Sequence, residues 1–192
     1  MTSLNTTVLR AIRAARAACA SEGPFVVAID GRSGAGKSTL AASLAKDLGA
    51  PLIEGDDFFA GGVTVRADPP EVLAAGCIDW RDEARVLKDL KAGRTARYAP
   101  FDWEAFDGSR APEVSIEPTD IILLEGVYSA RAELSDLIDF AILIETDPDE
   151  RLRRLIAREG EIGPWEAQWH RAEDWYFAQD ATPDRFDLVL KN

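Results

Sequence analysis

The sequence has few of the side chains on which several classes of protein depend. Its two cysteines, Cys19 and Cys77, are too few for a disulfide framework, and they lack the spacing of metal ligands. We interpret them as small apolar residues of a protein in a reducing compartment. The chain has a single histidine, His170, which argues against Ser-His catalysis and against a histidine-rich metal site.

Positive charge is also scarce, because 22 lysines and arginines face 34 acidic residues and the net charge is −12 at pH 7. Such a chain offers no broad basic surface to nucleic acid or to an anionic membrane, so we expect neither partner. The sequence lacks membrane-length apolar runs and a signal-peptide core, which favours a cytoplasmic location. Its 192 residues fit a single domain, 1–192, and leave a homodimer open.

Residues 1–22 are predicted to form a helix that packs on the domain. The segment carries Arg10, Arg13 and Arg16 and no acid up to position 21, a composition that overlaps with that of transit peptides. We favour the structural helix because its apolar side chains recur on one face. That face comprises Leu4, Val8, Ala11, Ile12, Ala15 and Cys19.

The most specific motif is the segment GRSGAGKS, residues 31–38, which matches the phosphate-binding loop G-x-x-x-x-G-K-[ST] at every specified position. Such a loop turns several backbone N–H groups toward one anion, and the N-terminus of the next helix adds positive charge. We expect Lys37 to reach the β- and γ-phosphates of a nucleotide and the Ser38 hydroxyl to bind Mg²⁺. The residues assigned to nucleotide binding are Gly31, Ser33, Gly34, Ala35, Gly36, Lys37, Ser38 and Thr39.

Five short apolar segments are predicted as strands, and helical segments separate them. The first lies immediately before the phosphate-binding loop, and a helix is expected over 37–48 behind it. The alternation predicts an α/β fold, a single P-loop NTPase domain with a five-stranded parallel sheet flanked by helices. The predicted strands are residues 25–30, 50–54, 121–126, 140–145 and 186–190.

Acidic residues lie at the carboxyl ends of two of these strands, where open α/β sheets bind their ligands. Asp56 and Asp57 follow the second strand, and Glu125 closes the third. Behind a phosphate-binding loop, we favour a metal-facing Glu125 over one that is only solvated. Either aspartate could act as a catalytic base, and the sequence does not separate them.

The helix expected after Thr146 carries Arg151, Arg154 and Arg158, which fall within about 60° of arc on one face. We favour contact between these guanidinium groups and phosphate, as part of an arginine lid and its following helix over residues 147–179. A solvated face paired with nearby acids would give the same pattern.

Two aromatic-rich segments give weaker signals. The apolar residues of segment 97–106 follow neither helical nor strand periodicity, and the segment is either a substrate-facing lobe or a folded surface loop. Farther along the chain, a stripe of aromatic and small residues recurs at helical spacing, which predicts core packing. His170 lies off this stripe and is expected to be exposed rather than catalytic. The stripe comprises Trp165, Trp169, Ala172 and Tyr176.

Together these motifs resemble those of the uridine kinase and phosphoribulokinase-like group of P-loop small-molecule kinases. The resemblance extends from about Phe25 to Leu190. Its parts are the phosphate-binding loop, the segments Asp56-Asp57-Phe58-Phe59 and Leu124-Glu125-Gly126, the arginine helix and the closing segment 183–189.

This resemblance implies roles for several of the residues above. Asp56 matches the acid that takes the proton from the acceptor hydroxyl, and Glu125 matches the acid that helps to hold Mg²⁺, usually through water. Arg151, Arg154 and Arg158 match the lid arginines that close over the triphosphate.

On the acceptor side, the resemblance implies that Asp79, which could also cap a helix over 82–91, contacts ribose hydroxyls. Phe101, Asp102 and Arg110 match a Tyr-Asp…Ser-Arg stretch, with Phe101 in place of the tyrosine. The histidine that uridine kinases usually carry between that aspartate and arginine is missing, which leaves the acceptor open. The remaining substrate-side assignments are Asp57 and Phe58.

The leading hypothesis is ATP- and Mg²⁺-dependent transfer of the γ-phosphoryl group to a hydroxyl of a small molecule, with a nucleoside as the favoured acceptor. One alternative acceptor is a sugar, a pantothenate-like alcohol or another hydroxylated metabolite. A second alternative, from another class, is a nucleotide-binding ATPase switch without an acceptor. The segment 79–110 discriminates between these classes, because a kinase needs a second pocket there.

Overall fold

The computed structural model describes residues 3–192, and its centre is one sheet of five parallel strands. The strands lie in the order β2-β5-β1-β6-β7, so the strand that precedes the phosphate-binding loop, β1, is central. The predicted α/β class and five-stranded parallel sheet are therefore confirmed. The strand bounds are Phe25–Asp30 for β1, Leu52–Glu54 for β2, Ile121–Glu125 for β5, Phe140–Glu145 for β6 and Leu188–Lys191 for β7.

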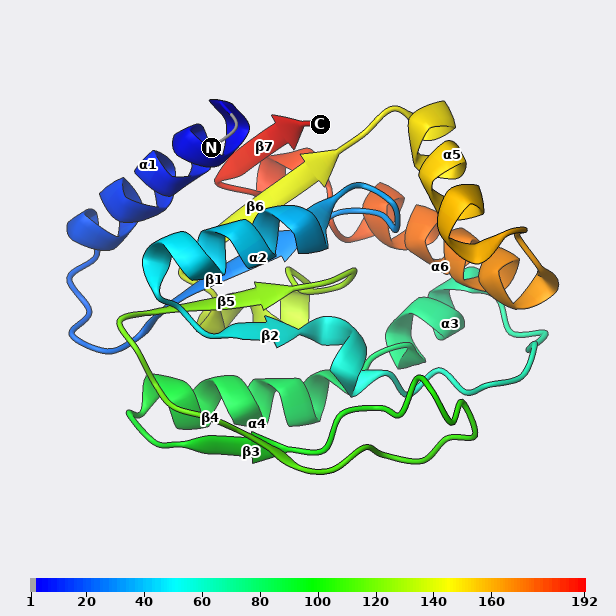
Figure 1. Cartoon of the computed structure of the whole chain (residues 1–192), viewed down its shortest axis with the longest axis horizontal. Coiled ribbons are helices and arrows are strands. Elements are labelled where there is room, and N and C mark those ends of the chain that lie inside the picture. Colours follow the sequence, from blue (N-terminus) through cyan, green and yellow to red (C-terminus); the bar gives the residue numbers. More distant parts are fainter. Residues whose placement is uncertain (1–2) are drawn as a thin grey trace.

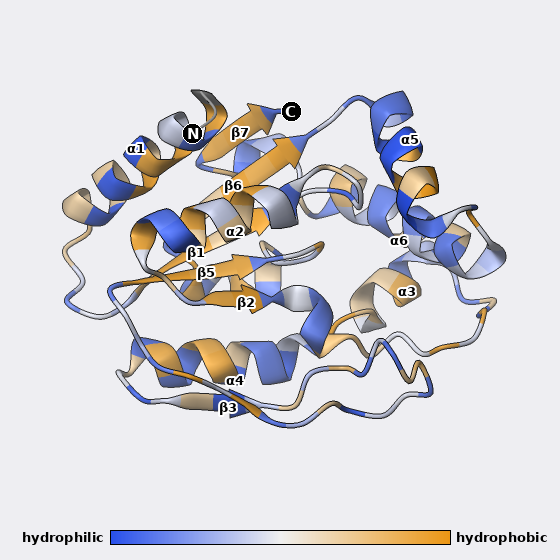
Figure 2. Ribbon diagram, viewed as in Figure 1, coloured by the Kyte–Doolittle hydropathy of each residue, from blue (hydrophilic) through white to orange (hydrophobic). Residues whose placement is uncertain are grey.

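Helices cover both faces of the sheet (Figure 1), which is why β1 and β5 are buried at every position. Val27 and Ile29 pack with α1 and α2, whereas Val26 points to the other face and packs with α3, α4 and α6. Figure 2 shows the resulting pattern, with hydrophobic strands between helices whose exposed sides are hydrophilic. The helix bounds are Ser3–Ala18 for α1, Lys37–Leu48 for α2, Pro70–Gly76 for α3, Trp80–Lys91 for α4, Pro148–Glu159 for α5 and Pro164–Gln179 for α6.

The N-terminal segment forms the structural helix that its apolar face predicts. Val8, Leu9 and Ile12 of α1 are buried against the sheet and α2. Arg16 forms an ion pair with Asp120 at 2.6 Å, which joins the end of α1 to the segment before β5. The first two residues of the predicted helix lie outside the described residues.

Acidic side chains set the starts of two helices. Asp79 accepts a hydrogen bond from the Asp82 N–H at 3.2 Å, so α4 begins at Trp80. Asp147 accepts hydrogen bonds from the backbone of the first turn of α5, where Pro148 occupies the first position. The predicted capping role of Asp79 is confirmed, and the helix starts two residues earlier than expected.

A small antiparallel ribbon lies beside α4, apart from the main sheet (Figure 1). It consists of β3, Ala96–Tyr98, and β4, Val114–Ile116. Neither β3 nor β4 is among the five strands predicted above, because three residues are too few to show a period. The loop between β3 and β4 carries most of the aromatic segment 97–106.

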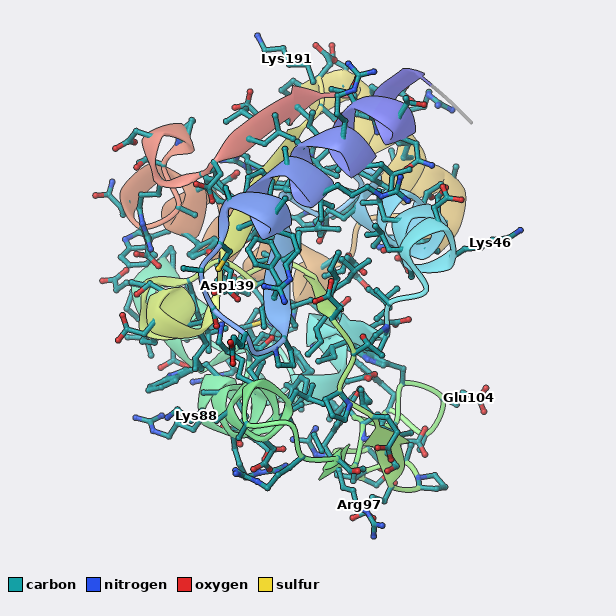
Figure 3. All side chains as sticks on the ribbon, turned by 90° about the vertical axis from the view of Figure 1, so that its left-hand side faces the viewer. Lys46, Lys88, Arg97, Glu104, Asp139 and Lys191 are labelled. Atoms are coloured by element: carbon teal, nitrogen blue, oxygen red, sulfur yellow. The ribbon has the colours of Figure 1, made fainter. Side chains whose placement is uncertain are left out.

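Charged side chains are distributed over the outside of the molecule. In Figure 3, Lys46, Lys88, Arg97 and Glu104 extend outward. Asp139 differs, since its carboxylate accepts hydrogen bonds from the Val26 N–H and from Lys91 Nζ. Within residues 3–192, the helices are too short or too polar to cross a bilayer.

The carboxyl ends of the sheet strands face the side of the molecule on which α3, α5 and α6 gather (Figure 1). A single 3-10 turn, η1, follows β2 and spans Gly55–Phe58. Two more 3-10 turns, η2 over Ala132–Leu137 and η3 over Pro183–Arg185, precede β6 and β7. Ligand sites of open parallel sheets lie at this edge, and the predicted functional residues converge there.

Candidate active site

The phosphate-binding loop joins the end of β1 to the N-terminus of α2. Gly31 has φ 148°, and a Cβ at this position would lie 2.5 Å from the carbonyl oxygen of Ile144. Only glycine fits such a backbone without strain. Lys37 is buried, and its Nζ donates to the Arg32 carbonyl at 3.3 Å, so the side chain folds back over the loop.

Asp30, the last residue of β1, is a buried anchor that the sequence prediction missed. Its carboxylate accepts hydrogen bonds from the N–H groups of Gly31, Tyr128 and Ala130 and from the Tyr176 hydroxyl, at 2.7–3.2 Å. Burial raises its pKa to about 6, although these hydrogen bonds oppose the shift. Asp30 thus ties the phosphate-binding loop to the segment after β5 and to α6. The available signal was an acid that closes an apolar strand directly before Gly31.

Ser38 and Glu125 meet beside the loop, as their predicted role in metal binding requires. Ser38 Oγ donates to Glu125 Oε1 at 3.2 Å. Burial raises the pKa of Glu125 to about 7, and the nearby Lys37 ammonium opposes the shift. A hydroxyl and a carboxylate are hard oxygen donors of the kind that Mg²⁺ prefers, so this pair fits the ion. Residues 3–192 contain no group of three or more His, Cys, Asp or Glu side chains that could hold a metal alone, so phosphate and water would complete the shell.

The two aspartates after β2 have different surroundings. Asp57 Oδ2 accepts a hydrogen bond from the Tyr98 hydroxyl at 2.8 Å, and burial raises the pKa of Asp57. Asp56 lines a cavity, and within the described chain its carboxylate has no hydrogen-bond partner. Of the two, Asp56 is therefore the one that is open to a bound molecule.

The cavity has a volume of about 560 Å³ and lies between the phosphate-binding loop, η1 and α6. Ser33, Leu155 and Arg158 line it from the loop and α5. The end at the loop is the one where Ser33 binds Glu173 of α6, and Trp165 lies about two turns of α6 away from that contact. At the other end is a group of five rings that we call the aromatic wall, contributed by the segment after η1, the loop after β3 and α6. The aromatic wall consists of Phe59, Trp103, Phe106, Trp165 and Trp169.

Glu173 of α6 is a second buried acid that the sequence prediction missed. It accepts hydrogen bonds from the Ser33 N–H at 3.0 Å and from Ser33 Oγ at 2.5 Å. Its carboxylate also lies 3.8 Å from Arg151 Nη2. The residue lies in the middle of α6, far along the chain from the loop, and no local pattern marks it. It fixes the first part of the phosphate-binding loop.

The predicted arginine face of α5 lies over this loop. Arg151 Nε donates to the Ser33 carbonyl at 2.9 Å, and Arg154 donates to the Gly34 carbonyl at 3.3 Å. Arg158 lines the cavity and pairs with Glu159. The three arginines therefore lie beside the predicted phosphate site, while their closing movement as a lid stays a prediction.

Most predicted substrate-side residues lie behind the cavity surface rather than on it. Phe58 is buried and stacks on Tyr98 with ring centroids 4.7 Å apart, and Phe101 is buried against Phe59. Asp79 caps α4, as described above. None of Phe58, Asp79 and Phe101 is among the cavity-lining residues of the described chain.

Asp102 and Arg110 likewise organise the loop between β3 and β4. Asp102 accepts hydrogen bonds from the N–H groups of Glu104 and Ala105, which closes a turn. Arg110 donates to the Asp57 carbonyl at 2.9 Å. Segment 97–106 is a folded loop that presents Trp103 and Phe106 to the cavity, so it is a surface loop in form and whether it faces a substrate stays a prediction.

Two expectations for α6 need correction. Trp169, Ala172 and Tyr176 are buried, as core packing predicts, but Trp165 is only partly buried and lines the cavity together with Trp169. His170 is partly buried in the cavity lining instead of exposed. A helical stripe identifies one face of α6 but not what that face contacts, so the cavity was not foreseeable from spacing.

The model of the phosphoribulokinase / uridine kinase family matches residues 26–161 of this chain. The chain belongs to this family. Among curated relatives, the uridine kinase of Halobacterium salinarum is 30% identical over 146 residues, which cover 70% of this chain and 62% of that protein. The uridine kinase of Macrococcus caseolyticus is 29% identical over 146 residues, covering 70% and 68%.

Solved structures of family type have the same fold. A possible uridine kinase from Bacillus stearothermophilus superposes with a TM-score of 0.70 at 23% identity, covering 97% of this chain and 96% of that one. Phosphoribulokinase from Rhodobacter spheroides gives a TM-score of 0.60 at 17% identity, covering 89% and 71%. The family match includes the phosphate-binding loop, Asp56 and Glu125. It ends before α6, which supplies Trp165, Trp169 and Glu173.

Proposed function

We propose that this protein is an ATP- and Mg²⁺-dependent phosphotransferase that moves the γ-phosphoryl group to a hydroxyl of a small molecule. One observation carries the proposal: a single cavity is lined by Ser33 of the phosphate-binding loop and by the open carboxylate of Asp56. Phosphoryl donor and alcohol could therefore meet without leaving the cavity. The names of the uridine kinase relatives make a nucleoside the first acceptor to test.

Phosphoryl transfer needs alignment and charge neutralisation more than covalent help. The backbone of residues 31–38 and the N-terminus of α2 would hold the triphosphate, with Lys37 against its terminal phosphates. Arg151 and Arg154, now bonded to loop carbonyls, are placed to exchange those contacts for phosphate oxygens. Mg²⁺, held by Ser38 and by Glu125 directly or through water, would neutralise charge on the phosphate oxygens.

Asp56 is proposed as the base that orients the acceptor hydroxyl and takes its proton. A general base must reach that proton by a hydrogen bond, which an unbonded carboxylate on the cavity surface can do. Asp57 is less suited, because its carboxylate is already bonded to Tyr98. This contrast favours Asp56 over Asp57, which the sequence left equal.

The test is the pair Asp56→Asn and Asp57→Asn. We expect Asp56→Asn to lower kcat by about a hundredfold or more while ATP binding is retained, since general-base catalysis contributes roughly that factor. Asp57→Asn is the matched control, and it should retain most of kcat. The measurements are acceptor-dependent ADP release and nucleotide binding by calorimetry. An unchanged kcat in Asp56→Asn would show that Asp56 is not the general base.

An ATPase switch gives a different result in the same assay. ADP release would then proceed equally with and without a panel of nucleosides, sugars and pantothenate-like alcohols. Stimulation by one class of alcohol instead supports the kinase and identifies its acceptor. No observation in the cavity favours the switch, because a switch needs no second pocket beside Asp56.

A further inference from the structure

The acceptor end of the cavity has an unusual chemistry for a site that binds a neutral nucleoside. Its surface is formed by the aromatic wall, whose neighbouring rings have centroids 5.0–6.4 Å apart. Trp103 and Phe106 remain 42% and 37% exposed. Aromatic faces attract cations through the negative charge of their π-systems, with tryptophan the strongest.

The polar groups around this wall are mainly acceptors of hydrogen bonds. Five carboxylates line the cavity, against the two basic side chains Arg158 and His170, and Arg158 is paired with Glu159. Glu159 is paired with Arg158 and Glu173 lies 3.8 Å from Arg151 Nη2, whereas Glu54, Asp56 and Glu166 have no basic partner within the described chain, whose net charge over the full sequence is −12. The five acids are Glu54, Asp56, Glu159, Glu166 and Glu173.

Hydrogen-bond donors are scarce at the wall. The indole N–H of Trp103 already donates to the Asp56 carbonyl, and that of Trp165 donates to the Gly62 carbonyl. The indole N–H of Trp169 and the hydroxyl of Tyr128 are buried and have no hydrogen-bond partner within the described chain, so neither donor reaches the cavity surface. A uracil ring presents two carbonyl oxygens that need donors, and leaving them unpaired on burial is costly. An ammonium group presents only donors and positive charge, which these surroundings can satisfy.

We propose that the acceptor is an alcohol that also carries a positively charged nitrogen, a primary amine or a quaternary ammonium group. The hydroxyl lies at Asp56, and the cationic group lies against the aromatic wall within the field of Glu166. Glu166 is suited to this because it lines the cavity and is adjacent to Trp165 in α6, and within the described chain no basic side chain is paired with it. The inference rests on the proposed kinase activity and specifies its substrate class.

The test compares alcohols in matched pairs that differ in charge. Choline is paired with its neutral carbon isostere, in which a tert-butyl group replaces trimethylammonium, and glucosamine is paired with glucose. Uridine serves as the neutral nucleoside. We expect kcat/KM to favour the charged member of at least one pair by about tenfold, the upper part of the range for cation–π contacts. Neutral members or uridine used as well as the cations would overturn the inference and leave the kinase activity standing.

Variants of the wall then locate the preference. Glu166→Gln keeps the length of the side chain and removes its charge, and Trp165→Leu removes a π-face. In both, the ratio of kcat/KM within a pair should fall toward one, whereas Trp165→Phe should keep most of it. Glu161→Gln is the matched control, because Glu161 is exposed in the segment between α5 and α6 and does not line the cavity.

Binding provides a readout that does not depend on turnover. The intrinsic fluorescence of the wall tryptophans is titrated with choline, its neutral isostere and uridine in the full-length protein. Tighter saturable binding of choline, lost in Trp165→Leu, supports the inference, and equal binding of choline and its isostere overturns it. Absence of ADP release with every alcohol would instead count against the proposed function, so the two failures are distinguishable.

Discussion

The two ends of the cavity are built in different ways. Around the phosphate-binding loop, polar groups are matched by hydrogen bonds, as between Asp30 and its four donors, Ser33 and Glu173, and Ser38 and Glu125. The aromatic wall instead depends on ring packing. Its hydrogen bonds are those of the Trp103 and Trp165 indoles, which donate to backbone carbonyls. One end is fixed by directional contacts and the other by shape.

This contrast indicates which end can vary without loss of the fold. Hydrogen bonds around the loop depend on backbone geometry, so a change there disturbs the sheet and the loop together. Rings that remain partly exposed contribute less to stability and can be exchanged to suit an acceptor. We therefore expect substitutions at the wall to change acceptor preference, and substitutions at the loop to affect nucleotide binding and stability.

The largest expected effect tests how far the wall belongs to the core. Trp169 is 7% exposed and Trp103 is 42% exposed, although both rings contact Phe59. Trp169→Ala should lower the free energy of unfolding by about 3–5 kcal/mol, because it leaves a large cavity. Trp103→Ala should lower it by about 1 kcal/mol or less and chiefly raise the KM of the acceptor. Urea unfolding and acceptor kinetics measure the two effects, and equal losses of stability would contradict this division.

A pair of glycines tests the two ends at the level of the backbone. A Cβ on Gly31 would meet the Ile144 carbonyl, whereas a Cβ on Gly61 would overlap the ring of Trp169. Both alanine variants should lose about 1–3 kcal/mol of stability, from backbone strain and from overpacking respectively. Their ligand responses should differ, since only Gly31→Ala should abolish the rise in Tm that ATP produces. Loss of that rise in Gly61→Ala would show that the two ends are not independent.

The sequence predicts the loop end well because its signals are local. The pattern of residues 31–38 specifies a turn, a helix start and a lysine within one continuous segment, and Glu125 closes a strand whose apolar run predicts its place. Asp56, which is assigned as the base because it matches the acid at that position in the family, also lines the cavity. These predictions needed only the order of strands and their parallel direction.

The wall could not be predicted in the same way, because its rings come from three segments that meet only in the folded chain. Phe58 and Phe101 are aromatic residues of the kind that line cavities, yet both are buried in the core. Their neighbours in the sequence, Phe59 and Trp103, line the cavity instead. Glu173 has a partner, Ser33, that is 140 residues away. Neither hydropathy nor period reports which of two adjacent aromatic rings faces a ligand.

The smallest expected effect compares two tyrosines that donate to aspartates, one that anchors the phosphate-binding loop and one that packs against η1. Tyr176 donates to buried Asp30 and Tyr98 donates to partly buried Asp57, each at 2.8 Å. Tyr176→Phe should cost about 1.5–3 kcal/mol at pH 8, as for a bond to a charged group, and Tyr98→Phe about 1 kcal/mol, because water can replace its donor.

The pH dependence identifies the source of the Tyr176 effect. The Tyr176 hydrogen bond lowers the pKa of Asp30, which burial has raised to about 6, so the variant should raise that pKa further. Wild-type folded protein then binds fewer protons than the folded variant near and above pH 6, and the cost of Tyr176→Phe grows as pH rises through this range. Urea unfolding between pH 5 and pH 8, values that bracket a pKa of about 6, measures this slope. A cost for Tyr176→Phe that does not change with pH would mean that Asp30 keeps one charge state in this range, and its titration would then not be the source of the effect.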